Sequence, residues 1–271
     1  MFYQVVRFPP KASQWGAFCF YGVLVFLGLS VPAVAEESSC RAERHDERVV
    51  VRHVLDGDTV ILTDGRHVRL IGINAPERAS KRRTAQPYSE RARSRLHALT
   101  DQEEGAVLLS YGAERNDRYG RTLAHLFLLD GSHLGADLLR DGLAAAIAVP
   151  PNLGFQKCLR ASEQRAREQG IGIWREARYA GKKVSELADI TGFVRVRGNL
   201  DGTGFSKDAL WLQVDGRLGL RIHKSNLRYF RRWNFHALRG KEVIVRGWLT
   251  RRKGKLRMEL KHPHDLEIVE H

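Results

Sequence analysis

The region after residue 47 alternates apolar and polar residues in three short runs. Residues 48–55, 59–63 and 67–73 place apolar side chains at alternating positions, which is the period of a strand with one buried face. Asp56-Gly57 and Asp64-Gly65 separate the runs, and Asp-Gly is typical of the tight type I′ turn of a β-hairpin. The pattern predicts a three-stranded meander, and residues that leave its ends can meet in one cleft.

The next hundred residues mix helical and strand periods. Pro87 suits a first helical turn and opens a predicted helix that runs to Leu99. Strands and helices together predict a mainly β, α+β domain over residues 48–176. The other predicted elements are strands at 106–111 and 121–129, a short helix at 133–140, and an amphipathic helix at 152–169 that ends at Gly170.

Shorter strands dominate after a predicted linker at residues 177–185. Short strands with one helix after the third are typical of an OB-like barrel, which we predict for residues 186–271. A different small all-β or α+β domain is the alternative. The predicted helix is 224–238, and the predicted strands are 192–197, 209–214, 217–222, 242–249, 255–261 and 266–269.

The first 35 residues have the layout of an export signal. Arg7 and Lys11 precede an uncharged apolar stretch, and Ala33-Val34-Ala35 offers small residues at the spacing of a cleavage site. We predict a cleaved signal at residues 1–35, a loose tail at 36–47, and a periplasmic or secreted protein without a stable membrane span. The alternative is an uncleaved N-terminal membrane anchor, because the apolar stretch approaches spanning length.

The cysteines agree with export. Cys19 would leave with the signal, so that Cys40 and Cys158 remain. An even pair in an oxidising compartment indicates one disulfide, here between the tail and a later helix. Two unrelated thiols are the alternative, and the spacing does not suit a zinc site.

Positive charge is the main feature of the composition. The formal net charge is +14 over 271 residues, which favours polyanionic partners such as nucleic acid or an anionic membrane surface. In the second predicted domain, residues 228–235 interleave basic and aromatic side chains, and residues 251–255 hold four basic ones. Cationic grooves with stacking rings suit single-stranded nucleic acid. Alternatively, the rings fill the core of a small barrel and the charges are solvated.

The meander supplies the groups that phosphodiester hydrolysis needs. Arginine forks match phosphoryl oxygens, a hard cation needs oxygen ligands, and a carboxylate must activate water. Asp58 follows the first turn, Arg69 lies on the third predicted strand, and Glu77 leaves its end as an isolated acid. The proline after Ala75 keeps that residue extended, which can turn its carbonyl towards a cation. Arg121, after a later polar turn, supplies a second arginine.

Motifs in a fixed order carry a family resemblance. DGDT at 56–59, RLIGINAPE at 69–77 and DRYGR at 117–121, with GLA at 142–144 and GIW at 172–174, resemble the thermonuclease family, the staphylococcal-nuclease-like proteins. The resemblance covers residues 48–176 and implies an OB-like five-stranded barrel with three helices that cleaves DNA and RNA with calcium. It implies these roles: phosphoryl binding by Arg69 and Arg121, general base Glu77, calcium ligands Asp58, Asn74 and the Ala75 carbonyl, and phosphate contacts from Arg118 and Tyr119.

Two positions depart from the family pattern. Asn74 stands where the family often has an aspartate, so a ligand oxygen is kept but a charge is lost. We expect weaker calcium affinity or a changed metal preference, because affinity follows ligand charge. The best-known members also carry base-flanking aromatic residues after the GLA step, and residues 145–151 contain none.

Each candidate also has a structural interpretation. In that interpretation Asp58 is a turn residue, Arg69 and Glu77 form an ion pair, and Arg121 is a solvated charge at a strand end. The basic residues 78–83 form either a solvated loop or a guide for phosphates beside Glu77.

The main hypothesis is an exported, calcium-dependent, sequence-nonspecific nuclease for DNA, RNA or both, with an added OB-like domain. Motifs for an activated serine or cysteine, or for a Gly-rich phosphate loop, are absent from the sequence. The alternative is a catalytically silent nucleic-acid-binding protein of the cell envelope. A third hypothesis is a protein-interaction scaffold that uses the C-terminal domain.

Overall fold

The structure, a computed structural model, describes residues 40–81, 84–187 and 190–269. The predicted signal at residues 1–35 lies outside this part of the chain, as do residues 36–39 of the predicted tail. Among the described residues, no helix is both long and apolar enough to cross a membrane.

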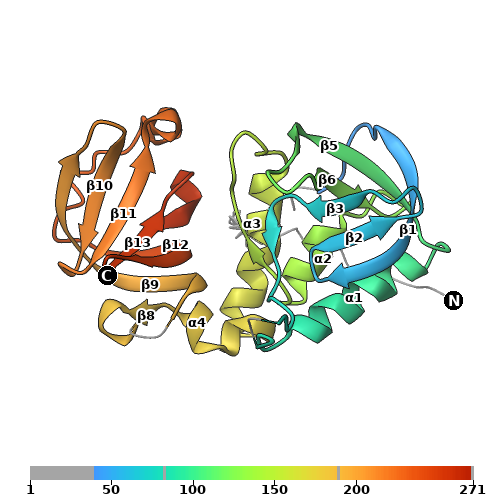
Figure 1. The fold of residues 1–271 in the computed structure, drawn as a ribbon, viewed down its shortest axis with the longest axis horizontal. Coiled ribbons are helices and arrows are strands. Elements are labelled where there is room, and N and C mark those ends of the chain that lie inside the picture. The colour runs from blue at the N-terminus through green and yellow to red at the C-terminus, as the bar shows by residue number, and fades with distance from the viewer. Residues whose placement is uncertain (1–39, 82–83, 188–189, 270–271) are drawn as a thin grey trace, which may run out of the picture. The chain divides into compact units, whose positions relative to one another are not determined.

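The first domain is built around a closed barrel (Figure 1). Its strands are β1 Glu47–Asp56, β2 Thr59–Leu62, β3 His67–Leu70, β5 Ala106–Asn116 and β6 Thr122–Phe127. They follow the order β1-β2-β3-β6-β5 around the barrel, and β5 returns to β1. The pair β3–β6 is parallel, whereas the other neighbours are antiparallel. This is the OB-like barrel that the family resemblance implies.

Helices close the core of this barrel. Ala92, Leu96 and Leu99 recur at i, i+4 and i+7 and form the buried face of the first helix. The described helices of this domain are α1 Ser89–Asp101, α2 Leu134–Arg140 and α3 Gln156–Glu168, followed by the 3₁₀ helix η1 Gly172–Arg175. A separate small sheet pairs β4 Ile73–Asn74 with β7 Ala145–Ala146.

Neither Asp-Gly pair forms the predicted type I′ turn. That turn needs positive φ at both central residues, and of these four described residues only Gly65 has it (φ +88°). The Gly65 N–H donates to the Leu62 carbonyl (3.0 Å), and the Leu62 N–H donates to the Arg66 carbonyl (2.9 Å). The second connection is therefore a three-residue loop ending in a left-handed glycine. Gly57 instead lets the turn pack closely against α1, because a Cβ at this position would lie only 2.5 Å from the Ala92 Cβ.

The second domain repeats the barrel. Its ring follows the order β9-β10-β11-β13-β12 and is closed by pairing of β12 with β9. The pair β11–β13 is parallel, in the same position as β3–β6 in the first barrel. The predicted second OB-like barrel is confirmed. Its strands are β9 Gly192–Phe205, β10 Ala209–Val214, β11 Leu218–His223, β12 Glu242–Arg252 and β13 Lys255–Glu259, with the edge strands β8 Lys182–Lys183 and β14 Leu266–Ile268.

The predicted helix at residues 224–238 is wrong in type and length. The chain forms the 3₁₀ helix η3 Lys224–Phe230, and the turns that follow use i→i+3 bonds, such as Trp233 N–H to the Phe230 carbonyl (2.9 Å). Aromatic residues lose side-chain freedom in an α-helix. Here the rings of Phe230, Trp233 and Phe235 gather with centroids 6.0 to 6.5 Å apart, and tight turns allow that packing.

The segment predicted as a linker is folded. It contains the short helix α4 Ala177–Ala180, and β8 pairs with β9 of the second barrel. The 3₁₀ helix η2 Val184–Glu186 follows, and Val184 and Leu187 are buried in the core of that barrel. The 3₁₀ helix η4 Pro263–Asp265 precedes β14.

A buried ion network joins the two barrels. Arg246 on β12 places Nη1 2.7 Å from Glu163 Oε2 on α3, and Nη2 2.7 Å from Glu267 Oε1 on β14. Arg246 is 3% exposed and Glu163 is 2% exposed. Glu163 Oε1 also accepts the Ala146 N–H of β7 (2.7 Å). The network therefore ties the second barrel to the strand that pairs with β4.

A disulfide closes a long loop of the first domain. Cys40 and Cys158 are bonded, with their Cα atoms 5.5 Å apart and a sequence separation of 118. The bridge attaches the segment before β1 to α3.

Two buried histidines make stability depend on pH. His125 Nδ1 lies 3.0 Å from His133 Nε2, and His133 Nδ1 accepts the Gly135 N–H (3.0 Å) at the start of α2. His133 therefore carries its proton on Nε2 and donates it to His125, so both rings are neutral. Burial lowers the pKa of His125 to about 4 and holds the pKa of His133 well below its ordinary value.

These shifts predict a loss of stability on mild acidification. Each folded pKa lies below the unfolded value, so between the two values the unfolded chain binds more protons. The contribution of His125 to the free energy of unfolding is expected to be fully present above about pH 6.5. Towards pH 4 this contribution falls by about 3 kcal/mol. Urea titrations of the parent and of His125→Phe at both pH values measure this. Equal losses of stability in the two chains would show that His125 does not cause the pH dependence.

Candidate active site

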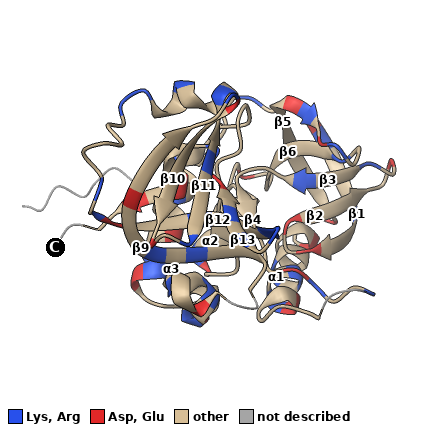
Figure 2. Ribbon diagram, turned by 60° about the vertical axis from the view of Figure 1, so that its left-hand side comes forward, with Lys and Arg blue, Asp and Glu red and all other residues tan. Residues whose placement is uncertain are grey.

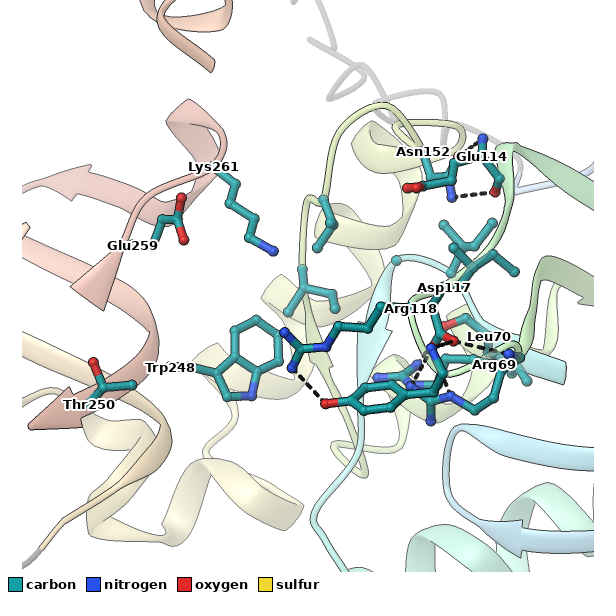
Figure 3. A pocket seen from close by; sticks show the side chains of 17 residues that line it. Arg69, Leu70, Glu114, Asp117, Arg118, Asn152, Trp248, Thr250, Glu259 and Lys261 are labelled. Carbon is teal, nitrogen blue, oxygen red and sulfur yellow. Dashed lines mark hydrogen bonds and ion pairs between the residues drawn. The ribbon is translucent and has the colours of Figure 1, made fainter. Parts of the chain in front are cut away.

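Arg69 and Arg121 open into one pocket. Arg69 lies on β3 and Arg121 immediately precedes β6, and these strands are parallel neighbours. Both line a pocket of about 610 Å³, as do Arg118 and Tyr119 from the turn before β6 (Figure 3). The structure thus brings together the predicted phosphate-binding residues from two separate motifs.

Asp58 lies buried beside Arg69. Arg69 Nη2 is 2.8 Å from Asp58 Oδ2, and the Ala75 N–H donates to the same oxygen (2.8 Å). The Thr59 hydroxyl donates to Asp58 Oδ1 (3.1 Å). Burial raises the pKa of Asp58 to about 7, and the Arg69 guanidinium opposes that rise. A carboxylate in such a position is stabilised by any additional positive charge.

Ala75, whose N–H bonds Asp58, follows Asn74 at the end of β4. Both are buried, and pairing of Asn74 with Ala145 across β4 and β7 fixes their backbone. Asp58, Asn74 and the Ala75 carbonyl together offer oxygen donors, which hard cations prefer. The described residues hold no group of three His, Cys, Asp or Glu side chains able to bind a metal.

Glu77 is exposed after β4 and does not line the pocket of the two arginines. Its N–H donates to Gln86 Oε1 (3.1 Å), and its carbonyl accepts the Gln86 N–H (2.8 Å). These bonds hold the backbone of Glu77 where the chain leaves the barrel. The side chain lies within reach of solvent water.

The turn before β6 arranges its own charges. Arg121 Nη2 lies 2.7 Å from Asp117 Oδ2, and the Tyr119 N–H donates to Asp117 Oδ1 (2.9 Å). Burial is the largest influence and favours the protonated form of Asp117, but the hydrogen bonds from Arg121 and Tyr119 and the Arg121 charge together outweigh it and lower the pKa. Arg118 donates to the Tyr119 hydroxyl (2.6 Å). Asp117 was not among the predicted site residues, although its spacing of four from Arg121 was a usable signal.

Similarity to known proteins agrees with this geometry. A family model described as Staphylococcal nuclease homologue matches residues 67–176. A thermonuclease of Staphylococcus intermedius is 34% identical over 157 residues, which are 56% of this chain and 89% of the relative. The chain belongs to the staphylococcal nuclease family. A thermonuclease of Staphylococcus hyicus is 32% identical over 162 residues, covering 56% of this chain and 92% of the relative. An endonuclease of Bacillus subtilis is 32% identical over 136 residues, covering 48% of this chain and 63% of the relative.

The family match does not cover the whole pocket of this staphylococcal nuclease homologue. It begins at residue 67, so it includes Arg69 and Arg121 but neither Asp58 nor the second barrel. The second barrel nevertheless lines the same pocket through Trp248, Thr250, Glu259 and Lys261 (Figure 3).

Sequence reasoning missed these contributions from the second barrel. Basic and acidic positions occur on both barrels (Figure 2), so net charge alone does not single out Lys261. The alternation along β12 places Arg246, Trp248 and Thr250 on one face, but this pattern does not show that the face meets the first barrel.

Proposed function

We propose that the chain is an exported, sequence-nonspecific nuclease that hydrolyses phosphodiester bonds of DNA, RNA or both with a divalent metal, calcium. The observation that carries this proposal is the pocket shared by Arg69 and Arg121, which come from neighbouring parallel strands. Family relatives named thermonuclease and endonuclease support it.

The two arginines stabilise the reacting phosphoryl group. Attack on phosphorus adds negative charge to its oxygens, and fixed guanidinium forks aimed at those oxygens favour the transition state. Asp58 orients Arg69 through the 2.8 Å contact, and Asp117 orients Arg121 through the 2.7 Å contact. Both forks are therefore held in place before substrate binds.

Glu77 is the proposed general base. A carboxylate with access to water can remove a proton from the attacking molecule and contributes roughly 100- to 10,000-fold to a rate. The backbone bonds to Gln86 hold Glu77 three residues after the end of β4. Arg118 and Tyr119 are proposed to contact a neighbouring phosphate of the substrate.

Asp58, Asn74 and the Ala75 carbonyl are the proposed metal ligands. These hard oxygen donors fit calcium, which would supply Lewis-acid stabilisation of phosphoryl oxygens if bound there. Only Asp58 carries a charge among the three. We therefore expect weaker calcium binding, or a different preferred metal, than for a site with two carboxylates.

Export is supported by the signal-like sequence at residues 1–35 and by the bond between Cys40 and Cys158. Disulfides persist in oxidising compartments and are rare in the cytosol.

Metal dependence of cleavage tests the proposed function. The purified chain is expected to cut a labelled oligonucleotide in calcium, to stop in excess chelator, and to resume when calcium is restored. Glu77→Gln is expected to cut roughly 100- to 10,000-fold more slowly under the same conditions. Undiminished cleavage by Glu77→Gln would remove the base assignment. Salt-dependent binding without cleavage in any divalent metal would instead support a silent nucleic-acid-binding protein.

A further inference from the structure

Two exposed aromatic side chains face the same pocket from different barrels. Among the described residues, the exposed large hydrophobic side chains are Val50, Tyr119, Phe205, Trp248 and Ile268. Tyr119 is 68% exposed and Trp248 is 39% exposed, and both line the pocket that holds Arg69 and Arg121. Trp248 is therefore not a buried core residue, because part of its indole is open to a pocket that is lined by arginines.

The geometry of β12 directs Trp248 into this pocket. Side chains on a strand alternate between its faces, so Arg246, Trp248 and Thr250 lie on one face. Arg246 is locked into the first domain by Glu163 at 2.7 Å. Trp248 follows roughly 7 Å further along the strand. The ion pair between Arg246 and Glu163 therefore also fixes the position of Trp248 relative to the first barrel.

A neighbouring ring packs against the indole. Phe193 pairs with Trp248 across β9 and β12, and the two ring centroids lie 5.2 Å apart in an edge-to-face arrangement. Phe193 is itself buried, in a cluster with Trp174 and Tyr179. Trp248 is thus held against a rigid base, and its remaining exposed surface faces the pocket (Figure 3).

The opposite wall of the pocket carries three arginines. Arg69, Arg118 and Arg121 come from the first barrel, and Lys261 lies on the same side as Trp248. Glu259 also lines the pocket, but Arg221 lies 3.3 Å from its carboxylate. Guanidinium groups on one side and an exposed indole on the other match the phosphates and the bases of a single strand.

We propose that Trp248 is a nucleobase-stacking platform contributed by the second barrel, which makes the site selective for single-stranded DNA or RNA. This inference rests on the proposed nuclease function. Phosphates of the strand lie along the arginines, and a base that is free of pairing stacks on the indole. A base inside a duplex has both faces covered by its neighbours and is not available to Trp248.

Binding without cleavage tests the platform. The full chain is mixed, in excess chelator, with dye-labelled single-stranded DNA, single-stranded RNA or duplex DNA, and anisotropy gives the affinity of each. Trp248→Leu is expected to bind both single strands roughly ten- to a hundredfold more weakly, as loss of one base–aromatic stack does. Trp248→Phe keeps a ring and is expected to restore most of the affinity. Binding of the duplex is expected to change little.

Trp211→Leu is the matched control. Trp211 lies on β10 of the same barrel, donates to Ser206 Oγ (3.2 Å), and does not line the pocket of Arg69. Its replacement is expected to leave single-strand affinity unchanged, while thermal unfolding verifies that each variant folds.

Cleavage in calcium separates the two claims. If the parent cleaves but Trp248→Leu binds single strands like Trp211→Leu, the platform is overturned and the nuclease stands. If the parent neither binds nor cleaves, both are overturned. Equal losses for single strands and duplex would also contradict a stacking role.

Discussion

Replacing Arg69 with alanine is expected to slow phosphodiester cleavage by roughly 100- to 1000-fold, the usual effect of removing one preorganised donor to the developing charge. Arg69 lines the pocket, and its Nη2 is held 2.8 Å from buried Asp58. Arg69→Lys keeps a positive charge but loses the planar fork, so its rate is expected to fall between those of the parent and Arg69→Ala. Initial rates with a labelled oligonucleotide in calcium measure all three.

Arg66→Ala is the matched control for this prediction. Arg66 lies in the same hairpin, where its Nη2 is 2.7 Å from Glu47 Oε2, and it does not line the pocket. Its replacement is expected to change the rate by less than about twofold, as for positions away from the chemistry. Equal rates for Arg66→Ala and Arg69→Ala, in chains that melt normally, would show that Arg69 is not part of the reaction site.

Replacing Arg246 with alanine is expected to lower the free energy of unfolding by about 3 to 5 kcal/mol. The loss is large because Glu163, only 2% exposed, would keep its charge in the interior without its partner. Glu267 would also lose its 2.7 Å contact with Arg246. Urea-induced unfolding at pH 7 measures the difference from the parent.

Arg95→Ala provides the comparison for an exposed pair. Arg95 Nε lies 2.6 Å from Asp141 Oδ2, and the two side chains are 39% and 40% exposed. Solvent screens such a pair, so its removal is expected to cost less than about 1 kcal/mol. If Arg246→Ala loses no more stability than Arg95→Ala, the ion network does not hold the barrels together.

The consequences of Arg246→Ala extend to the reaction site. Glu163 Oε1 holds the Ala146 N–H of β7 at 2.7 Å, and β7 pairs with the strand that carries Asn74. Loss of the network also releases the face of β12 on which Trp248 stands.

The strands of both barrels were predictable because their apolar residues follow the pleat. The period of two at residues 48–73 and 209–222 reflects side chains that alternate between core and surface. Turn geometry was less accessible. Asp56-Gly57 favours a type I′ turn locally, but packing of Gly57 against Ala92 imposes another backbone. Helix starts moved for a similar reason, since Asn152 bonds the Glu114 backbone and α3 begins at Gln156.

The candidate site was predictable where it depends on ordered motifs. Asp58, Arg69 and Ala75 lie close in sequence, and the meander brings them into contact. Trp248 was not predictable as a wall of this pocket. Its position depends on docking between barrels through Arg246 and Glu163, which are 83 residues apart, and no local pattern records that contact.

Calcium-dependent cleavage is the measurement that tests the central claim most directly. The rate at which the purified chain cuts labelled single-stranded DNA and RNA is compared in calcium, in excess chelator, and in chelator with calcium restored. We predict cleavage in the first and third conditions and none above background in the second. Cleavage that continues unchanged in chelator would contradict the metal-dependent mechanism, and absence of cleavage in every divalent metal tried would contradict the nuclease itself.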